Sequence, residues 1–311
     1  MWALDKKTLG VSHLLARFRG WIQAGATLLT NIHLPNFLKG GLYQGKGKVI
    51  CVPGLNCYSC PAASGACPIG SFQAVVGSSK FRFSYYITGF LILLGVLLGR
   101  VICGFLCPFG WFQELLHKIP TKKLSTKKLK PLTYLKYMVL LVMVVLLPVL
   151  VTNQLGMGDP FFCKYLCPQG VLEGAIPLSL ANAGIRAALG SLFTWKFIVL
   201  LTVIVLSIVF YRPFCKWLCP LGAFYALLNK VSLFQMQVDQ SKCVSCGKCA
   251  KVCKMDVDVT KSPNHTECIR CGMCIRACPT DAVSFRYGFG SGKQQSKNEQ
   301  TTTEVKTEES K

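Results

Sequence analysis

Three long apolar runs interrupt the polar positions of this chain. They cover Phe83–Leu98, which continues into residues 101 and 102, Tyr137–Val151 and Phe197–Tyr211. Together with its flanking residues, each run is long enough to cross a hydrocarbon layer about 30 Å thick as a helix. The pattern therefore predicts at least three membrane-spanning helices.

Two weaker segments and a polar C-terminal part complete the pattern. Gly20–Leu38 is a fourth candidate span that contains several polar residues, whereas Val171–Phe193 carries charged residues and a proline and better fits an interfacial or re-entrant piece. After residue 230 the chain becomes polar, and from Gly288 onward it has no apolar period. We expect a mainly α multi-pass bundle of about four spans in residues 1–230, a soluble module in 231–287 and a disordered tail in 288–311.

The composition agrees with a membrane protein. The chain is 51% hydrophobic but only 15% charged, whereas soluble domains carry about 25% charged residues. Its net charge of +22 raises the question of a nucleic-acid partner. We expect no nucleic acid, because the basic residues lie mostly in loops beside the apolar runs, where the positive-inside rule accounts for them.

Loop charge predicts the orientation in the membrane. The loop between the first two clear runs is strongly basic and is therefore expected on the cytoplasmic side. Its lysines are Lys118, Lys122, Lys123, Lys127, Lys128, Lys130 and Lys136. By parity, residues 39–82 and 156–194 lie outside and everything after Arg212 lies inside. The predicted location is the cytoplasmic (inner) cell membrane, with lipid around the spans and the C-terminal module on the cytoplasmic side.

Eight of the 18 cysteines fall in two short runs near the C-terminus. Both runs have the spacing C-x2-C-x2-C-x3-C of bacterial ferredoxins with two 4Fe-4S clusters, in which the fourth cysteine of each run binds the other cluster. One predicted ligand set is therefore Cys243, Cys246, Cys249 and Cys278, and the other is Cys268, Cys271, Cys274 and Cys253. A pair of zinc sites is the alternative for such cysteines. Two complete runs favour clusters and a ferredoxin module of the α+β class.

A second pattern, Cys-Pro-x-Gly, occurs four times. Its cysteines are Cys67, Cys107, Cys167 and Cys219, and in three copies another cysteine lies four residues earlier, at Cys103, Cys163 and Cys215. Residues four apart share one face of a helix. We interpret the proline as the end of that turn and the glycine as a sharp redirection of the backbone. Each copy then supplies two thiolates, so two copies must meet to bind one cluster through four cysteines.

The predicted topology pairs the copies into an inner and an outer cluster. Two copies follow spans on the cytoplasmic side, each after an arginine (Arg100 or Arg212), and would form the inner cluster with Cys103, Cys107, Cys215 and Cys219. The outer cluster would use Cys60, Cys67, Cys163 and Cys167, since the Cys-Pro-x-Gly repeat favours Cys60 and Cys67.

Two outer cysteines, Cys51 and Cys57, are left over. They could form a disulfide, act as redox-active thiols, or replace one of the chosen outer ligands. For any single cysteine of the membrane part, the alternative is a small buried hydrophobic residue.

The repeat of a span followed by R-x2-C-x3-C-P-x-G, with two ferredoxin runs behind it, resembles the membrane-bound polyferredoxins of the NapH, NosR and CcoG type. The string Cys51-Val-Pro-Gly-Leu-Asn-Cys57-Tyr-Ser-Cys60-Pro is most similar to the YccM-like branch of 4Fe-4S membrane electron transport proteins. The resemblance covers roughly residues 15–285. It implies quinol oxidation, electron delivery to extracytoplasmic enzymes, or metal and cofactor maturation. It carries over only the cysteines and no residues for a quinol site.

Three functions fit these observations. The leading one is an electron carrier that links a cytoplasmic donor or acceptor to the quinone pool or to an extracytoplasmic redox protein. A quinol dehydrogenase subunit would be a true enzyme and would need a lipid-accessible pocket near a cluster. A maturation factor that reduces a metal ion or a disulfide on the outer face would use Cys51 and Cys57. The electron carrier faces one obstacle: clusters on opposite faces of a layer about 30 Å thick cannot exchange electrons directly unless they lie well below the surface.

Overall fold

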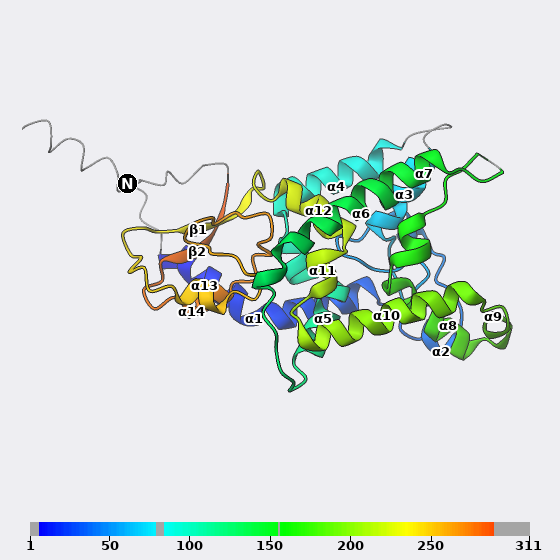
Figure 1. Cartoon of the computed structure of the whole chain (residues 1–311), viewed down its shortest axis with the longest axis horizontal. Helices are drawn as coiled ribbons and strands as arrows, with labels where there is room; N and C mark the ends of the chain where they lie inside the picture. The colour runs from blue at the N-terminus through cyan, green and yellow to red at the C-terminus, as the bar shows by residue number, and fades with distance from the viewer. Residues whose placement is uncertain (1–5, 79–83, 155, 289–311) are drawn as a thin grey trace, which may run out of the picture.

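The computed structural model describes residues 6–78, 84–154 and 156–288, and it is mainly helical. A helical part and a smaller module that contains the two strands lie at opposite ends of its long axis (Figure 1). Among the predicted segments, the first residue of the run at Phe83 and the tail beyond Gly288 lie outside the described residues.

Two of the described helices are long and apolar enough to cross a membrane. One runs from Lys127 to Leu150 and comprises η3 (Lys127–Tyr134), α6 (Leu135–Val139), η4 (Leu140–Leu146) and α7 (Leu147–Leu150). The other is α10 (Ser191–Val209). Many of their apolar side chains face outward: Val205 is 60% exposed and Leu141 is 53% exposed. The π-helical turns of η4 directly precede Pro148, which lacks the amide hydrogen that a regular helix needs there.

The other predicted spans differ from the helices that form. The first clear run becomes α4 (Tyr85–Leu98), an apolar helix of 14 residues. At 1.5 Å per residue it is shorter than a hydrocarbon layer about 30 Å thick. The bounds predicted for Gly20–Leu38 are wrong, because the helix α1 covers Lys6–Thr30 and a turn follows it. The side-chain amide of Asn31 donates to the Thr27 carbonyl at 3.1 Å and so caps the end of α1.

The segment predicted as interfacial is a broken helix. It comprises η6 (Gly170–Ala175), α8 (Ile176–Ala181) and α9 (Ala183–Ala187). Asn182 separates the last two helices with an extended backbone, and its Oδ1 accepts the Gly184 amide at 3.0 Å. This is an ordinary N-cap, which starts α9 in a new direction.

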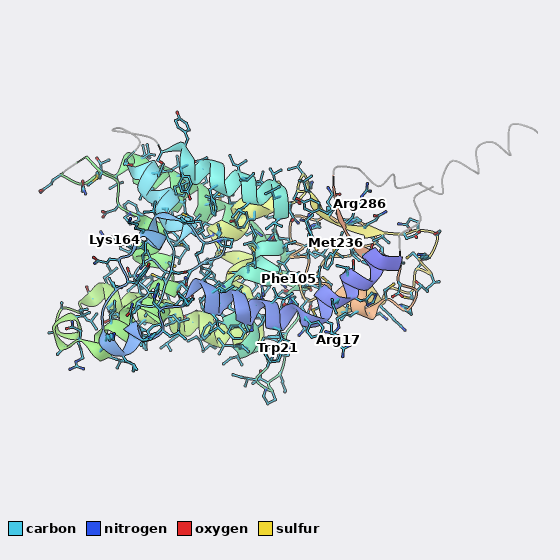
Figure 2. All side chains as sticks on the ribbon, turned by 180° about the vertical axis from the view of Figure 1, so that it is seen from behind. Arg17, Trp21, Phe105, Lys164, Met236 and Arg286 are labelled. Carbon is cyan, nitrogen blue, oxygen red and sulfur yellow. The ribbon has the colours of Figure 1, made fainter. Side chains whose placement is uncertain are left out.

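Helix α1 connects the two ends of the molecule. Near its start, Ser12 Oγ accepts the Phe285 amide of the module at 3.1 Å. At its end, the Thr30 carbonyl accepts the Ser64 amide at 2.9 Å. Arg17 and Trp21 mark the course of α1 beside the module in Figure 2, where Phe105 of the helical part lies close to Met236 of the module. The module is therefore packed onto the helical part through a shared apolar core.

The module is closed by two antiparallel strands, β1 (Phe234–Val238) and β2 (Val283–Tyr287), in which Phe234 pairs with Tyr287. Between them lie two helices that pack on each other, α13 (Lys248–Val252) and α14 (Met273–Ala277). The remaining helices are α2 (Asn36–Lys39), η1 (Lys46–Val49), α3 (Pro68–Gly77), η2 (Ile102–Leu106), α5 (Pro108–His117), η5 (Phe162–Leu166), α11 (Pro213–Trp217) and α12 (Pro220–Leu228).

Candidate iron–sulfur sites

Two cavities in the module are each lined by four cysteines. A cavity of about 410 Å³ is lined by Cys243, Cys246, Cys249 and Cys278. The other is lined by Cys253, Cys268, Cys271 and Cys274, together with apolar residues such as Val257 and Ile269. In each cavity the fourth cysteine of one run joins the first three of the other run. The structure thus groups the eight cysteines in the sets expected from their spacing.

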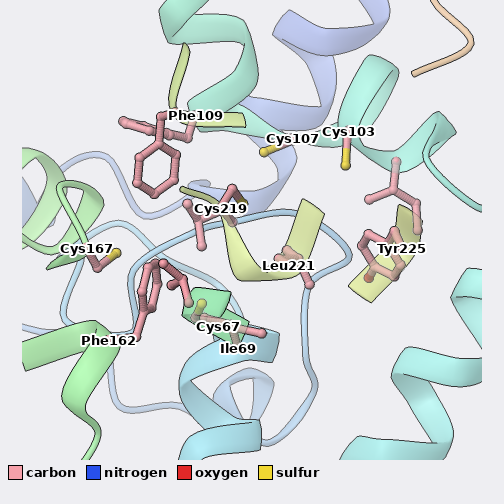
Figure 3. Packing of buried hydrophobic residues seen from close by; sticks show 14 of the residues in the cluster. Cys67, Ile69, Cys103, Cys107, Phe109, Phe162, Cys167, Cys219, Leu221 and Tyr225 are labelled. Carbon is pink, nitrogen blue, oxygen red and sulfur yellow. The ribbon is translucent and has the colours of Figure 1, made fainter. Parts of the chain in front are cut away.

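The four cysteines predicted for the inner cluster also lie together. Cys103, Cys107, Cys215 and Cys219 are all buried. Cys219 is close enough to the other three to interact with them electrostatically. Figure 3 shows Cys103 and Cys107 side by side, near Cys219, in a setting of packed apolar residues. These cysteines come from η2, from α11 and from the residues that precede α5 and α12.

The Cys-Pro-x-Gly segments have the geometry of a helix start. In α3, α5 and α12 the cysteine is the N-cap residue with an extended backbone, and the proline is the first helical residue. The Cys219 sulfur accepts the Gly222 amide at 3.3 Å, and Cys67, Cys107 and Cys167 accept the amide of the corresponding glycine. As interpreted from the sequence, the turn ends here, since η2 and η5 stop at the residue before the Cys-Pro pair. The proline also begins the next helix, where its missing amide hydrogen is not needed. A helix N-terminus also stabilises a thiolate.

In the second copy of the repeat, a close contact requires the glycine, Gly110. A Cβ atom at Gly110 would lie 2.8 Å from Arg212 Nη1 and 3.2 Å from the Cys103 carbonyl oxygen. A Cβ atom at Gly170 would lie 3.8 Å from the Cys57 sulfur. The helix starts thus pack tightly against neighbouring cysteines.

The outer cavity contains Cys57 where the sequence favoured Cys60. This cavity, of about 430 Å³, is lined by four cysteines, Cys57, Cys67, Cys163 and Cys167. Cys60 lies apart from the lining, buried with Ala62 and Ala63, and its thiol donates to Asn31 Oδ1 at 3.5 Å. The sequence favoured Cys60 as an outer ligand, whereas the structure places Cys57 in the lining of this cavity and Cys60 outside it.

The two leftover cysteines of the sequence pattern are placed differently from each other. Cys57 lines the outer cavity, and its amide donates to the Glu173 carboxylate at 3.0 Å. Cys51 is buried, and its thiol donates to Ser71 Oγ at 3.6 Å. Of the three roles considered for this pair, the replacement of a chosen ligand describes the position of Cys57.

The inner and outer sites are neighbours, not opposite ends of the helical part. One apolar core contains Cys103, Cys107 and Cys219 of the inner set and Cys67 and Cys167 of the outer set (Figure 3). The two consecutive amides of Leu55 and Asn56 donate to sulfur atoms of different sites, Leu55 to Cys107 and Asn56 to Cys67. Gly54, just before these two residues, approaches the Cys107 backbone, and Leu55 and Asn56 themselves line the outer cavity, so the loop contacts both sites.

The loop that makes this bridge is held in place at two points. A Cβ atom at Gly54 would lie 2.8 Å from the Cys107 Cα, so only glycine lets the loop approach so closely. The Tyr225 hydroxyl donates to the Pro53 carbonyl at 3.1 Å. The loop therefore lies between the two groups of cysteines that the sequence placed on opposite faces.

Two buried arginines link the two halves of the inner site. Arg100, just before Cys103, donates to the Cys215 carbonyl at 3.5 Å, and Arg212, just before Cys215, donates to the Cys103 carbonyl. Arg100 also forms an ion pair with Glu267 at 2.9 Å. The side chains of both arginines are fully buried, so they place positive charge in a region of low dielectric constant.

Burial raises the pKa of three site thiols that begin Cys-Pro-x-Gly copies. The pKa of Cys67, Cys107 and Cys167 rises to about 12. Bound iron would offset this cost, because metal coordination deprotonates a thiol. No three described His, Cys, Asp or Glu side chains are close enough for a single metal ion. A 4Fe-4S cluster needs a wider arrangement, because each of its four thiolates binds a different iron. The three cysteine-lined cavities and the four buried cysteines of the inner site fit that donor set.

Sequence reasoning missed a set of polar residues around the cysteines. The residue six positions after the cysteine of each Cys-Pro-x-Gly copy is polar: Gln73, Gln113, Glu173 and Tyr225. All four contact groups outside their own copy. The extended repeat C-P-x-G-x2-polar was the signal that could have identified them.

Comparisons with known proteins agree with these sites. A family described as a 4Fe-4S binding domain matches residues 65–86, 83–127, 137–176 and 192–237, and each match contains one Cys-Pro-x-Gly copy. A second family with the same description matches residues 236–257 and 262–284. No solved structure matches the chain.

Several relatives match more than half of the chain. The chain is 32% identical to the uncharacterized protein MJ0750 of Methanocaldococcus jannaschii, over 64% of this chain and 77% of that protein. It is 28% identical to Escherichia coli YccM over 55% of this chain and 45% of that protein. It is 26% identical to the methylamine utilization ferredoxin-type protein MauN of Methylorubrum extorquens, over 61% of this chain and 56% of that protein. The chain thus spans about half the length of YccM and of MauN. The chain belongs to the polyferredoxin family of 4Fe-4S electron transport proteins that includes YccM, MauN and NosR.

Proposed function

We propose that this chain is a membrane-embedded electron carrier with four 4Fe-4S sites in a row. The observation that carries the proposal is the loop at Gly54, Leu55 and Asn56, which approaches Cys107 of the inner site through Gly54 and lines the outer cavity with the next two residues. A 4Fe-4S cluster held by four cysteines supplies one-electron transfer. The protein residues fix the separation between the sites and exclude water from the middle of the row.

The module is held against the inner site at the next step of the row. The Ile269 carbonyl oxygen would lie 2.3 Å from a Cβ at Gly104, the residue after Cys103. Asn229 connects the same two segments, since its Oδ1 accepts the Arg100 amide at 3.0 Å and its Nδ2 donates to the Cys268 carbonyl at 3.1 Å. These contacts support the order Cys243 site, Cys268 site, inner site and outer site along the row.

The proposed membrane placement follows from the two long apolar helices and the basic loop. In this placement α4 and α1 complete a bundle of about four spans, the module and Lys118–Lys136 face the cytoplasm, and the outer cavity faces the opposite side. The donor or acceptor in the cytoplasm and the partner at the outer site are separate redox proteins. MauN carries a ferredoxin-type name, which agrees with a role as one member of a larger redox system.

A cavity beside the module favours quinone as a second candidate partner. It measures about 290 Å³ and lies between the loop before α6 and the module, with Trp217 and Glu267 in its wall. Trp217 is two residues from Cys215, and Met255, also in the wall, is two residues from Cys253. The maturation role has weaker support, because the two outer cysteines left over, Cys51 and Cys60, are both buried and donate to separate partners, Ser71 and Asn31.

The test is the iron and acid-labile sulfide content of protein purified anaerobically in detergent. We expect roughly 16 iron atoms per chain, since each 4Fe-4S cluster takes four cysteines. Cys57→Ser should lower this to about 12, whereas Cys60→Ser, the matched control, should leave it unchanged. A content of about 8 in the unmodified chain, or a loss in Cys60→Ser but not in Cys57→Ser, would refute the proposed sites.

A further inference from the structure

Two buried glutamines reach from one half of a membrane site to a cysteine of the other half. Gln113, six residues after Cys107, donates from Nε2 to the Cys215 sulfur at 3.1 Å. Gln73, six residues after Cys67, donates from Nε2 to the Cys163 sulfur at 3.1 Å. The same relation thus occurs once in the inner site and once in the outer site.

The orientation of each amide is fixed by a backbone group. Gln113 Oε1 accepts the Phe214 amide at 3.2 Å, and Gln73 Oε1 accepts the Phe162 amide at 3.0 Å. An amide hydrogen must meet an oxygen rather than an NH2 group, so the nitrogen of each glutamine has to face the sulfur. Both side chains are 0% exposed, which keeps water from competing for the sulfur.

The third copy of the repeat has no glutamine that donates to a cysteine sulfur. Its sixth residue is Glu173, whose carboxylate accepts the Cys57 amide instead of donating to a sulfur. The outer site therefore has a carboxylate near one of its cysteines, whereas the inner site has two buried arginines. The two glutamines are the side-chain amide donors that both sites share.

A hydrogen bond to a ligand sulfur stabilises the more negative state of a site. Reduction adds one electron, so the amide–sulfur bond is stronger in the reduced form, and the reduction potential rises with such bonds. On the basis of the proposed cluster sites, we propose that Gln113 and Gln73 set the reduction potentials of the inner and outer clusters, respectively, by donating to Cys215 and Cys163.

The test measures midpoint potentials by redox titration followed by electron paramagnetic resonance, on the full chain in detergent. The variants are Gln113→Leu and Gln113→Glu, and the same pair at Gln73. Glutamate keeps the acceptor for the backbone amide but loses the donor to sulfur. Cys219→Ser and Cys167→Ser assign the inner and outer signals.

We expect both Gln113 variants to lower the inner potential only and both Gln73 variants to lower the outer potential only. The control is Gln23→Leu, a buried glutamine in α1 whose amide has no hydrogen-bond partner among the described residues, and it should leave both potentials unchanged. Unchanged potentials in variants that retain about 16 iron atoms would overturn this inference and leave the proposed function intact. Loss of the cluster from both variants of one glutamine would also overturn it, since that glutamine would then be an assembly residue. About 8 iron atoms in the unmodified chain would instead refute the membrane sites themselves.

Discussion

Glu267 offers a sharp test of how the module is attached to the inner site. Its carboxylate accepts from Arg100 Nη1 at 2.9 Å and from Lys136 Nζ at 2.5 Å. The side chains of Arg100 and Lys136 are 0% exposed and that of Glu267 is 11% exposed, so solvent screens these pairs only weakly. Burial alone would raise the pKa of Glu267, but Arg100 and Lys136 outweigh it and hold that pKa below its ordinary value. The carboxylate is thus ionised at neutral pH and neutralises part of the charge of two buried cations.

The change Glu267→Gln keeps the shape and removes the charge. Loss of one partner from a buried ion pair costs about 3–5 kcal/mol, because the remaining charge stays buried. Since about 1.4 kcal/mol corresponds to a factor of ten, opening of the contact between module and helical part should become about two to four orders of magnitude more frequent. The expected site of the effect is the segment around Glu267, while the strands β1 and β2 keep their own pairing.

Native-state hydrogen exchange, read by mass spectrometry, measures this opening directly. In peptides that cover residues 264–272, protection against exchange should fall by about two to four orders of magnitude. Asp239→Asn is the matched control: its pair with Lys242 is at 3.8 Å with the lysine 44% exposed, so the expected change is below about 1 kcal/mol. The double variant Glu267→Gln/Lys136→Met removes one of the two unpaired cations and should recover part of the protection. Equal protection in Glu267→Gln and Asp239→Asn, or no recovery in the double variant, would refute the electrostatic account.

Three further outcomes follow from the same structure. Gly54→Ala should lower the iron content by about four atoms per chain, because its Cβ would meet the backbone of Cys107. Gly89→Ala, whose Cβ would meet nothing within 4 Å, should leave the iron content unchanged, and iron analysis compares the two variants. Arg212→Gln removes a buried positive charge beside the inner site and should lower the inner midpoint potential but not the outer one, as measured by redox titration; equal shifts at both sites would contradict this. On slow exposure to air in the presence of an alkylating reagent, the exposed Cys246 should be labelled first and the buried Cys60 last, as followed by mass spectrometry, and the reverse order would contradict the burial pattern.

The sequence predicted best where the ligands are local. The eight module cysteines lie in two short runs with the ferredoxin spacing, which predicts crossed sets of four, and each cavity of the module is lined by one of these sets. The outer site failed because Cys60 has the proline of the repeat behind it, whereas Cys57 lies ten residues before Cys67 and has no local signal. The position of Cys57 at the outer cavity depends on its contacts with Gly170 and Glu173, which belong to a distant part of the chain. The hydropathy pattern likewise predicted α10. It gave the wrong bounds for α1, because α1 packs against the module and needs no continuous apolar surface.

The burial of the cysteines follows the order of the proposed row. At one end Cys246 is exposed, and at the other end Cys57 and Cys163 are partly exposed. All four cysteines of the inner site, between these ends, are buried. A chain of redox centres that was open along its length would lose electrons to oxygen or to unrelated proteins at every step. In the proposed row, packed apolar residues and the loop at Leu55 enclose the inner site, so redox proteins would reach the row at its two ends and the protein between them would keep neighbouring sites close and dry.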